Sequence, residues 1–210
     1  MKALLHPTYF PTIHSFSIQL NHDVIWEIYD NYQKQTYRNR TYICTDRGKH
    51  MLSIPIVHVG NATGRQVYRN IKLDNSYKWQ RQHWRTLETA YRTSPFFEFY
   101  EDDIKPLFEV SFDTLMNFNF ETIKTICDCL QVPISNRQTE YFETTPKNVR
   151  DLRFLANAKR QHFSPNPEYM QVFNSKHGFV PNLSILDLLF NLGPNTSSYL
   201  KALDMTSENA

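Results

Sequence analysis

His6 is a first candidate for proton transfer. It lies between a short apolar run, residues 3–5, and Pro7. Pro7 favours extended backbone at His6, and Pro11 suits the first turn of a helix. We therefore expect His6 at the carboxyl edge of a strand, where ligands bind in open α/β sheets. His6 is either a ligand-binding or acid–base residue, or a histidine satisfied within a capped turn.

His83 is a second candidate for proton transfer. Trp79 and His83 are four residues apart in KWQRQHW, so they share one face of a helix. Trp79, together with Tyr9, could stack on a sugar or a base, and His83 could act as an acid or base. Tyr91 is expected to form a wall of the same site. The alternative is that Trp79 belongs to the core and His83 to its polar rim.

A basic loop, QKQTYRNRTY, carries candidates for anion binding. Lys34, Arg38 and Arg40 alternate there with polar residues, among which Tyr37 and Asn39 are further binding candidates. In extended backbone Arg38 and Arg40 share a face. Two guanidiniums and a lysine can hold a phosphate or a carboxylate. A solvated basic loop is the alternative interpretation.

Several kinds of site are excluded by what the chain lacks. Its 5 glycines are isolated, so neither a dinucleotide-binding nor a P-loop motif occurs. The remaining histidines form no ligand pattern, and we predict no metal site. The 3 cysteines show no CxxC spacing and are expected to be buried thiols. No cofactor is indicated.

Composition limits the partners. The 210 residues carry a net charge of +2, which argues against general nucleic-acid binding, and aromatics reach 14%. No run approaches the roughly 20 apolar residues of a membrane span. The N-terminal apolar run is too short for a signal peptide, so we expect a cytoplasmic protein that binds a small-molecule substrate. The oligomeric state is not indicated.

The strands are expected before about residue 74. Apolar runs predict strands over 2–6 and 23–29, joined by a helix of the length that a parallel pair needs. Two further strands, 40–46 and 50–59, meet in a hairpin at Arg47-Gly48-Lys49. The alternating segment 67–74 is a fifth strand candidate.

Helices are expected afterwards. They cover 76–93 with Ser76 as the N-cap, 102–108, a segment from Ser111 or Asp113 to 130, and a last helix between Ser184 and Gly193. Residues 132–142 read as extended. The chain is therefore predicted to be one α/β domain over residues 1–205. It has a small mixed sheet in the N-terminal part, about 1–74, and a mostly helical C-terminal part, about 75–205.

Five segments occur in one order along the chain. They are HPTYFP, the YQKQTYRNR loop after a strand that ends in Asp30, the SIPI strand, the Trp79/His83 helix with its SPFF exit, and GFVPNLSILDLLFNLGP. This layout resembles the WbqC-like protein family over nearly the whole chain, and FVPNLSILDLLFNLG is its most specific part. In that family a glutamine usually precedes the Pro-x-Tyr-x-Pro motif, and this chain has His6 there.

The resemblance implies an enzyme of surface-polysaccharide (O-antigen-type) biosynthesis. It would be an acyl or glycine transferase that acts on an amino group of a nucleotide-linked sugar. The basic loop would hold a diphosphate or a carboxylate, Tyr9 and Trp79 would stack on the sugar or base, and His83 or His6 would take the proton. Two alternatives stand: a non-catalytic protein that binds a nucleotide sugar or a partner in glycan assembly, and a nucleotidyltransferase-like enzyme.

Overall fold

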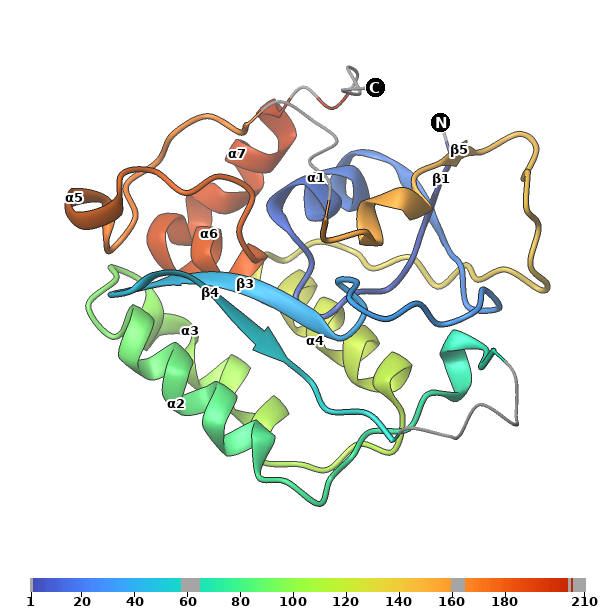
Figure 1. The fold of residues 1–210 in the computed structure, drawn as a ribbon. Coiled ribbons are helices and arrows are strands. Elements are labelled where there is room, and N and C mark those ends of the chain that lie inside the picture. Colours follow the sequence, from blue (N-terminus) through green and yellow to red (C-terminus); the bar gives the residue numbers. More distant parts are fainter. Residues whose placement is uncertain (1, 58–64, 160–164, 204, 206–210) are drawn as a thin grey trace.

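A three-stranded parallel sheet forms one end of the molecule. The computed structural model describes residues 2–57, 65–159, 165–203 and 205. β1 (Lys2–Leu5) and β2 (Asp23–Trp26) pair in parallel, in register from Lys2↔Asp23 to Leu5↔Trp26. α1 (Ile13–Asn21) connects them, and the Thr12 side chain accepts a hydrogen bond from the Ser15 N–H at its start. The predicted strand–helix–strand unit is confirmed (Figure 1).

The third strand comes from far along the chain. β5 (Arg150–Asp151) pairs in parallel with β1 on the side opposite β2, which gives the order β2-β1-β5. β1 is therefore the central strand, and Ala3, Leu4 and Leu5 are buried. Burial on both faces explains why its apolar residues run continuously and do not alternate.

An antiparallel hairpin forms a separate sheet. β3 (Arg40–Thr45) pairs with β4 (Gly48–Ser53) from Arg40↔Ser53 to Thr45↔Gly48. Gly48 has a φ of +92°, which a glycine adopts without strain. The predicted hairpin is confirmed, although its second strand ends before Pro55. The rest of the predicted strand 50–59 is extended only as far as residue 57, and residues 58–59 lie outside the described residues.

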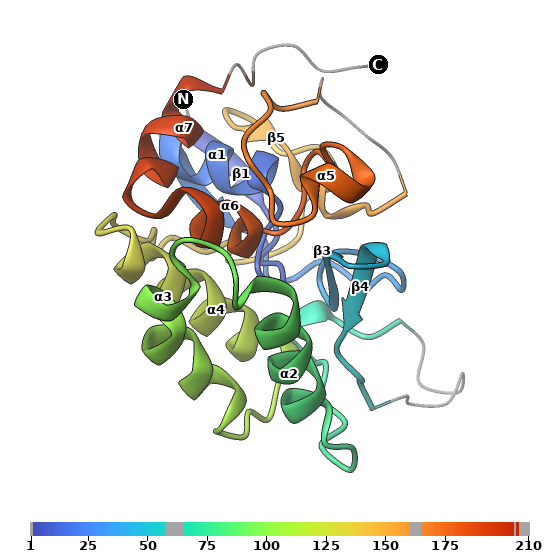
Figure 2. The ribbon, with the colours of Figure 1, turned by 90° about the vertical axis from the view of Figure 1, so that its left-hand side faces the viewer.

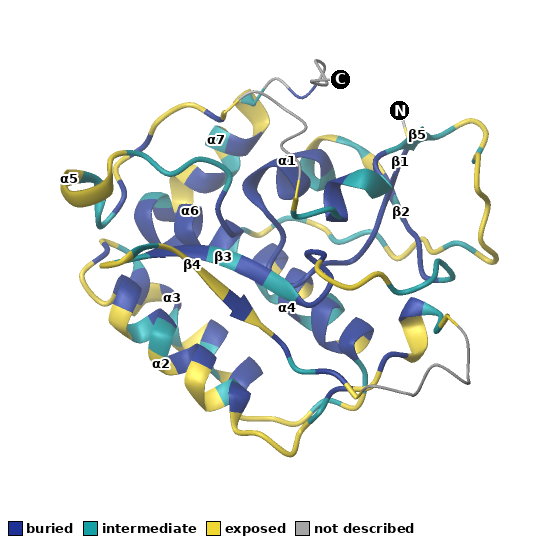
Figure 3. Cartoon of the chain, in the orientation of Figure 1, coloured by how far each residue is buried: buried dark blue, intermediate teal, exposed yellow. Residues whose placement is uncertain are grey.

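The helices lie mostly in the second half of the chain. They are α2 (Trp79–Tyr91), α3 (Phe97–Ile104), α4 (Leu115–Cys129), α5 (Asn174–His177), α6 (Ile185–Leu192) and α7 (Thr196–Ala202), with short 3₁₀ turns at Tyr68–Asn70, Lys105–Phe108, Arg153–Ala156 and Gly193–Asn195. Figure 2 shows α1, α6 and α7 above α2, α3 and α4, with the hairpin beside both groups. Buried residues from both halves form one hydrophobic core (Figure 3). The predicted α/β class, with a mostly helical second half, is confirmed.

Two helix caps were predicted, with different outcomes. Ser184 caps α6 by accepting a hydrogen bond from the Leu186 N–H, and Gly193 ends that helix with a φ of +52°, as expected. Ser76 does not cap α2, because its N–H and hydroxyl both bond to Asp74 Oδ1 and the helix begins after Lys78. Ser76 therefore belongs to an Asx-type turn before the helix and does not act as the N-cap that the sequence pattern predicts.

The fifth predicted strand is wrong. Residues 68–70 form a 3₁₀ turn, and the segment makes only isolated bridges, Ile56↔Leu73 and Lys72↔Thr114 among them. Tyr68 is fully buried and donates its hydroxyl to the Pro7 carbonyl at 2.6 Å. That single tertiary anchor outweighs the period-2 pattern, since no strand of the described residues lies beside this segment to complete a ladder.

Candidate functional site

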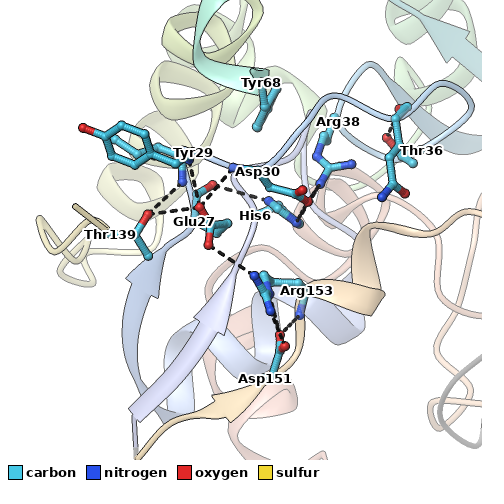
Figure 4. Close-up of polar contacts among 12 residues, drawn as sticks. His6, Glu27, Tyr29, Asp30, Thr36, Arg38, Tyr68, Thr139, Asp151 and Arg153 are labelled. Atoms are coloured by element: carbon cyan, nitrogen blue, oxygen red, sulfur yellow. Dashed lines mark hydrogen bonds and ion pairs between the residues drawn. The ribbon is translucent and has the colours of Figure 1, made fainter. Parts of the chain in front are cut away.

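Polar residues gather where the three parallel strands end. His6 follows β1, Glu27 follows β2, and Asp151 is the last residue of β5. The register pairs Leu5 with Trp26 and Leu4 with Asp151, so these ends lie at one edge of the sheet. Figure 4 shows the three side chains converging there with Asp30, Arg38 and Arg153. The predicted position of His6 at the carboxyl edge is confirmed.

His6 is held between three groups. Its Nε2 lies 2.6 Å from Arg38 Nη2 and 3.1 Å from Asp30 Oδ2, and its Nδ1 lies 3.3 Å from the Glu27 carbonyl oxygen. A guanidinium can only donate, so Nε2 accepts from Arg38 and the Nδ1–H donates to the carbonyl. This arrangement fixes a neutral imidazole and its tautomer.

The charges around His6 agree with a neutral ring. Burial, and then the positive charge of Arg38, lower the pKa of His6 to about 4. Burial raises the pKa of Asp30, but the positive charge of Arg38 and the hydrogen bonds that the carboxylate accepts outweigh burial, and the net shift is downward. Asp30 is therefore a carboxylate at neutral pH, and its side chain, 14% exposed, is the most accessible of the three.

Glu27 organises the turn that carries Asp30. Its buried carboxylate accepts the N–H of Tyr29 at 2.8 Å and the N–H of Asp30 at 3.1 Å. The Thr139 hydroxyl donates to the same oxygen at 3.1 Å, and Arg153 Nη1 lies 3.3 Å from the other. A buried carboxylate with this many donors is satisfied within the protein, so Glu27 positions its neighbours.

Arg38 is anchored from two further elements. Asn119 of α4 donates to the Arg38 carbonyl at 2.7 Å and to the Tyr68 hydroxyl at 2.6 Å. The guanidinium carbon lies 5.3 Å from the centre of the Tyr68 ring, within cation–π range. Arg38 is buried and donates to Asp30 Oδ2 at 2.7 Å, so its charge is already compensated.

Arg153 makes the second ion pair of the site. It contacts both oxygens of Asp151, at 2.8 Å through Nε and at 2.6 Å through Nη2. Bidentate geometry makes this pair strong, and it holds the side chain over the end of β5. The hydrogen bond with Asp151 raises the pKa of Arg153. Burial raises the pKa of Asp151, but its side-chain and backbone hydrogen bonds with Arg153 and the charge of Arg153 together outweigh burial and lower it.

These residues line a cavity of about 300 Å³, called here the strand-end cavity. Its lining is His6, Asp30, Gln33, Thr36, Arg38, Asp151, Arg153, Phe154, Ala156 and Asn157. Two carboxylates and two guanidiniums balance in the lining, and the Glu27 carboxylate behind it adds one negative charge. The strand-end cavity therefore suits a hydroxyl-rich or amine-bearing group better than a polyanion.

Three predicted site residues form a different, buried cluster. Tyr9 donates its hydroxyl to His83 Nδ1 at 2.9 Å, and the Trp79 and His83 rings are 5.3 Å apart. His83 also hydrogen bonds to the Ser53 backbone, and burial lowers its pKa to about 4. The His83 ring therefore has two hydrogen-bond partners within the protein, Tyr9 and Ser53. None of the three residues belongs to the lining of the strand-end cavity as the structure describes it.

Tyr91 lies in another buried network. Its hydroxyl donates to Asp187 Oδ2 at 2.7 Å, while Tyr169 and Gln171 donate to Oδ1 at 2.6 and 3.0 Å. Burial raises the pKa of Asp187 despite these three donors. Asp187 is therefore a buried carboxylate with three hydrogen-bond donors.

The basic loop is divided by the fold. Arg38 points into the strand-end cavity, Lys34 is exposed, and Arg40 begins β3. Asn39 donates to the Ile54 carbonyl at 3.1 Å, and Tyr37 lines a separate cavity. The functions predicted for these residues remain predictions. The residues themselves do not lie together at one site.

The predicted site residues do not include Glu27, Asp151 and Arg153. A polar residue directly after a buried strand is a signal that Glu27 shares with His6, although the sequence pattern places Glu27 within the strand. Asp151 ends a two-residue, partly buried strand, where the apolar pattern is weak, and carries no such signal.

Two kinds of feature are absent from the described residues. No group of three His, Cys, Asp or Glu side chains in this part of the chain could hold a metal ion. No helix within the described ranges is both long and apolar enough to cross a membrane.

Comparison with known proteins places the chain. The sequence profile of the WbqC-like protein family matches residues 6–163 and 153–199. A protein of Mycobacterium tuberculosis (strain ATCC 25618 / H37Rv), named "Uncharacterized protein Rv1507c", is 24% identical over 205 residues, which cover 83% of this chain and 86% of that protein. No solved structure matches. Because the family profile spans most of the sequence, the chain belongs to the WbqC-like protein family.

Proposed function

We propose that this protein is an enzyme of surface-polysaccharide biosynthesis. It transfers an acyl group, with glycyl transfer as the leading case, to the amino group of a nucleotide-linked sugar. Membership of the WbqC-like family supports this class of function, and the strand-end cavity supports the amine acceptor.

One observation carries the proposal: Asp30, the most accessible member of the Arg38–Asp30–His6 contact, lines a cavity in which both arginines of the described lining are already paired. Arg38 and Arg153 are each paired with a carboxylate. A sugar ammonium group can therefore donate to Asp30 without opposing an uncompensated charge. Hydroxyl groups of the sugar have Gln33, Thr36 and Asn157 of the same cavity as partners.

The chemical step follows from these positions. The bound ammonium first gives one proton to water. The free amine nitrogen then attacks the acyl carbonyl carbon, the new N–C bond forms, and the bond to the donor's leaving group breaks. The second proton passes to the Asp30 carboxylate, because His6 Nε2 already accepts from Arg38. The lowered pKa of Asp30 makes it a weak base. The leaving group therefore has to be a good one, such as a thiolate or a phosphate.

A specific observation also favours a non-catalytic alternative. Every ionisable side chain of the strand-end cavity already has a partner within the protein. Groups committed in this way suit recognition of a nucleotide sugar without turnover.

A two-stage experiment separates the two functions. Thermal unfolding is first measured with a UDP-linked amino sugar, its N-acetylated counterpart, glycine and acyl-CoA compounds. Mass spectrometry then searches mixtures of the stabilising ligands for the acylated amino sugar. Product formation supports the transferase, and stabilisation by the amino sugar alone supports the binding protein. Absence of any stabilisation refutes both.

Asp30→Asn is the informative variant in this experiment. It should abolish the preference for the free amine over the N-acetylated sugar, because an amide cannot compensate the ammonium charge. The matched control is Asp102→Asn, which makes the same change at an exposed position of α3. Equal effects of the two variants would contradict the assignment of the amine to Asp30.

A further inference from the structure

A second cavity borders the strand-end cavity across a thin backbone wall. Thr36 and Asn157 form an antiparallel bridge, and the Tyr37 N–H donates to the Ala156 carbonyl at 2.8 Å. Thr36, Ala156 and Asn157 line the strand-end cavity, whereas Tyr37 and Lys159 line the second one. The two cavities therefore flank this one pair of segments.

The second cavity has the opposite electrostatic character. It has a volume of about 380 Å³, and its lining includes Tyr37, Lys49, Lys159 and Asn182. Among the described residues, the lining holds two ammonium groups and a phenol but no carboxylate. We call it the lysine cavity. Its positive charge contrasts with the balanced lining of the strand-end cavity.

Lys49 is held at this cavity without a counter-ion. Its Nζ lies 4.6 Å from the centre of the Tyr42 ring, and the Tyr42 and Tyr37 rings meet edge to face at 6.0 Å. Within the described ranges no carboxylate lies at ion-pair distance from Lys49 or from Lys159. Burial lowers the pKa of Lys49. Both lysines remain exposed residues, so an anion from solvent can reach and compensate their charges.

Lys159 is positioned by the turn that follows the bridge. Its N–H donates to Asn157 Oδ1 at 2.9 Å. Asn157 thus faces the strand-end cavity while its side chain fixes the backbone that carries Lys159 to the lysine cavity. Asn157 therefore lines the strand-end cavity and fixes the backbone at the edge of the lysine cavity.

We propose that the lysine cavity is an anion subsite that takes a phosphoryl group between Lys49 and Lys159. Two ammonium groups match a dianionic phosphate, and the Tyr37 hydroxyl can add a hydrogen bond. The identity of the rest of the ligand rests on the proposed function. A nucleotide-linked amino sugar would place its diphosphate here and its amine in the strand-end cavity. This subsite replaces the Lys34–Arg38–Arg40 anion site expected from the sequence, because Arg38 is paired with Asp30.

Titration of the full chain with inorganic pyrophosphate tests the subsite. Calorimetry at low ionic strength should show binding to the wild-type protein. Lys49→Gln and Lys159→Gln should each weaken it at least about tenfold, the size of one charge-assisted hydrogen bond. The control is Lys201→Gln, an exposed lysine of α7, which removes the same charge elsewhere. Thermal unfolding of each variant confirms that it is folded.

The outcomes separate this inference from the proposed function. No wild-type binding, unchanged affinity in both cavity variants, or equal weakening by Lys201→Gln would overturn the subsite. Pyrophosphate binding that depends on Lys49 and Lys159 supports the subsite, even if no acylated sugar is ever detected. Acyl transfer without pyrophosphate binding would support the proposed function and overturn the subsite alone.

Discussion

Arg38 donates to His6 across 2.6 Å, and this contact defines what His6 can be. A guanidinium has no lone pair to offer, so the imidazole must accept at Nε2 and donate from Nδ1 to the Glu27 carbonyl. His6 therefore acts as an acceptor on one side and a donor on the other. A glutamine amide has the same pair of functions, and glutamine usually stands at this position in proteins that this chain resembles.

His6→Gln should preserve the fold of the site. The amide oxygen can accept from Arg38 and the amide nitrogen can donate to the Glu27 carbonyl, so we expect a loss of less than about 1 kcal/mol in the free energy of unfolding. His6→Ala removes both bonds and leaves a cavity, which should cost about 3 kcal/mol. Urea unfolding measures both. A glutamine variant as unstable as the alanine variant would contradict the donor–acceptor description.

The Arg38–Asp30 pair should show strong coupling. Arg38→Met leaves a partly buried carboxylate without its partner, and we expect a loss of about 3 kcal/mol. Adding Asp30→Asn in the same chain should recover part of that loss, because the stranded charge is removed. A double-mutant cycle in urea gives the coupling energy.

The exposed pair Arg92–Glu101 provides the control for this cycle. Its arginine side chain is 43% exposed, and such pairs contribute about 0.5 kcal/mol. Coupling energies of similar size in the two pairs would mean that Arg38 and Asp30 are solvated like surface residues.

Stability should fall as the pH is lowered from about 6.5 to 4. Burial lowers the pKa of His6, His14 and His83 from 6.5 to about 4. Between these values the unfolded chain binds protons that the folded chain does not, so the free energy of unfolding decreases with falling pH. Each histidine contributes up to about 3 kcal/mol of this loss once the pH is below its folded pKa.

Variants assign this pH dependence to particular rings. Urea unfolding at about pH 7 and about pH 4.5 should show a smaller decrease for His83→Gln than for the wild type. His177→Gln, at an exposed position of α5, should leave the decrease unchanged. Identical decreases in both variants would show that His83 does not contribute.

Tyr9→Phe tests whether the Tyr9–His83–Trp79 cluster is structural. The variant removes the hydroxyl that donates to His83 Nδ1, which should cost about 1 to 2 kcal/mol of stability. Since Tyr9 is 0% exposed, we expect the affinity for the amino sugar to stay within about twofold of the wild type. Tyr77→Phe, with Tyr77 65% exposed, is the matched control and should change neither quantity. A large loss of affinity in Tyr9→Phe would instead support the stacking function predicted for Tyr9.

The chain's local elements were largely predictable, because they depend on short-range patterns. The strand before His6, the hairpin around Gly48 and the helix between Ser184 and Gly193 each follow from apolar runs, caps and turn residues. Errors occurred where one tertiary contact outweighed a local pattern. The segment at Tyr68 is such a case, since a buried hydroxyl bond to Pro7 replaced a strand.

The site was only half predictable. His6 and Arg38 were identified by residue type and by position after a strand or in a basic loop. Their direct contact spans 32 residues of sequence and could not be read from spacing. The predicted grouping of Arg38 with Lys34 and Arg40 assumed that all three charges were available, and the fold pairs Arg38 with Asp30.

The sequence by itself determined the fold class, the family and the position of His6 at the end of the first strand. Those features depend on hydrophobic periodicity, on prolines and on motifs that neighbouring residues express together. The tertiary structure alone decided which charged side chains form ion pairs and which have no carboxylate partner among the described residues. Asp151 and Arg153 join His6 only because β5 pairs with β1 from about 150 residues away, and Lys49 and Lys159 line one cavity only because the hairpin packs beside that segment. Charge compensation depends on distances of a few ångströms between remote residues, and no local pattern encodes those distances.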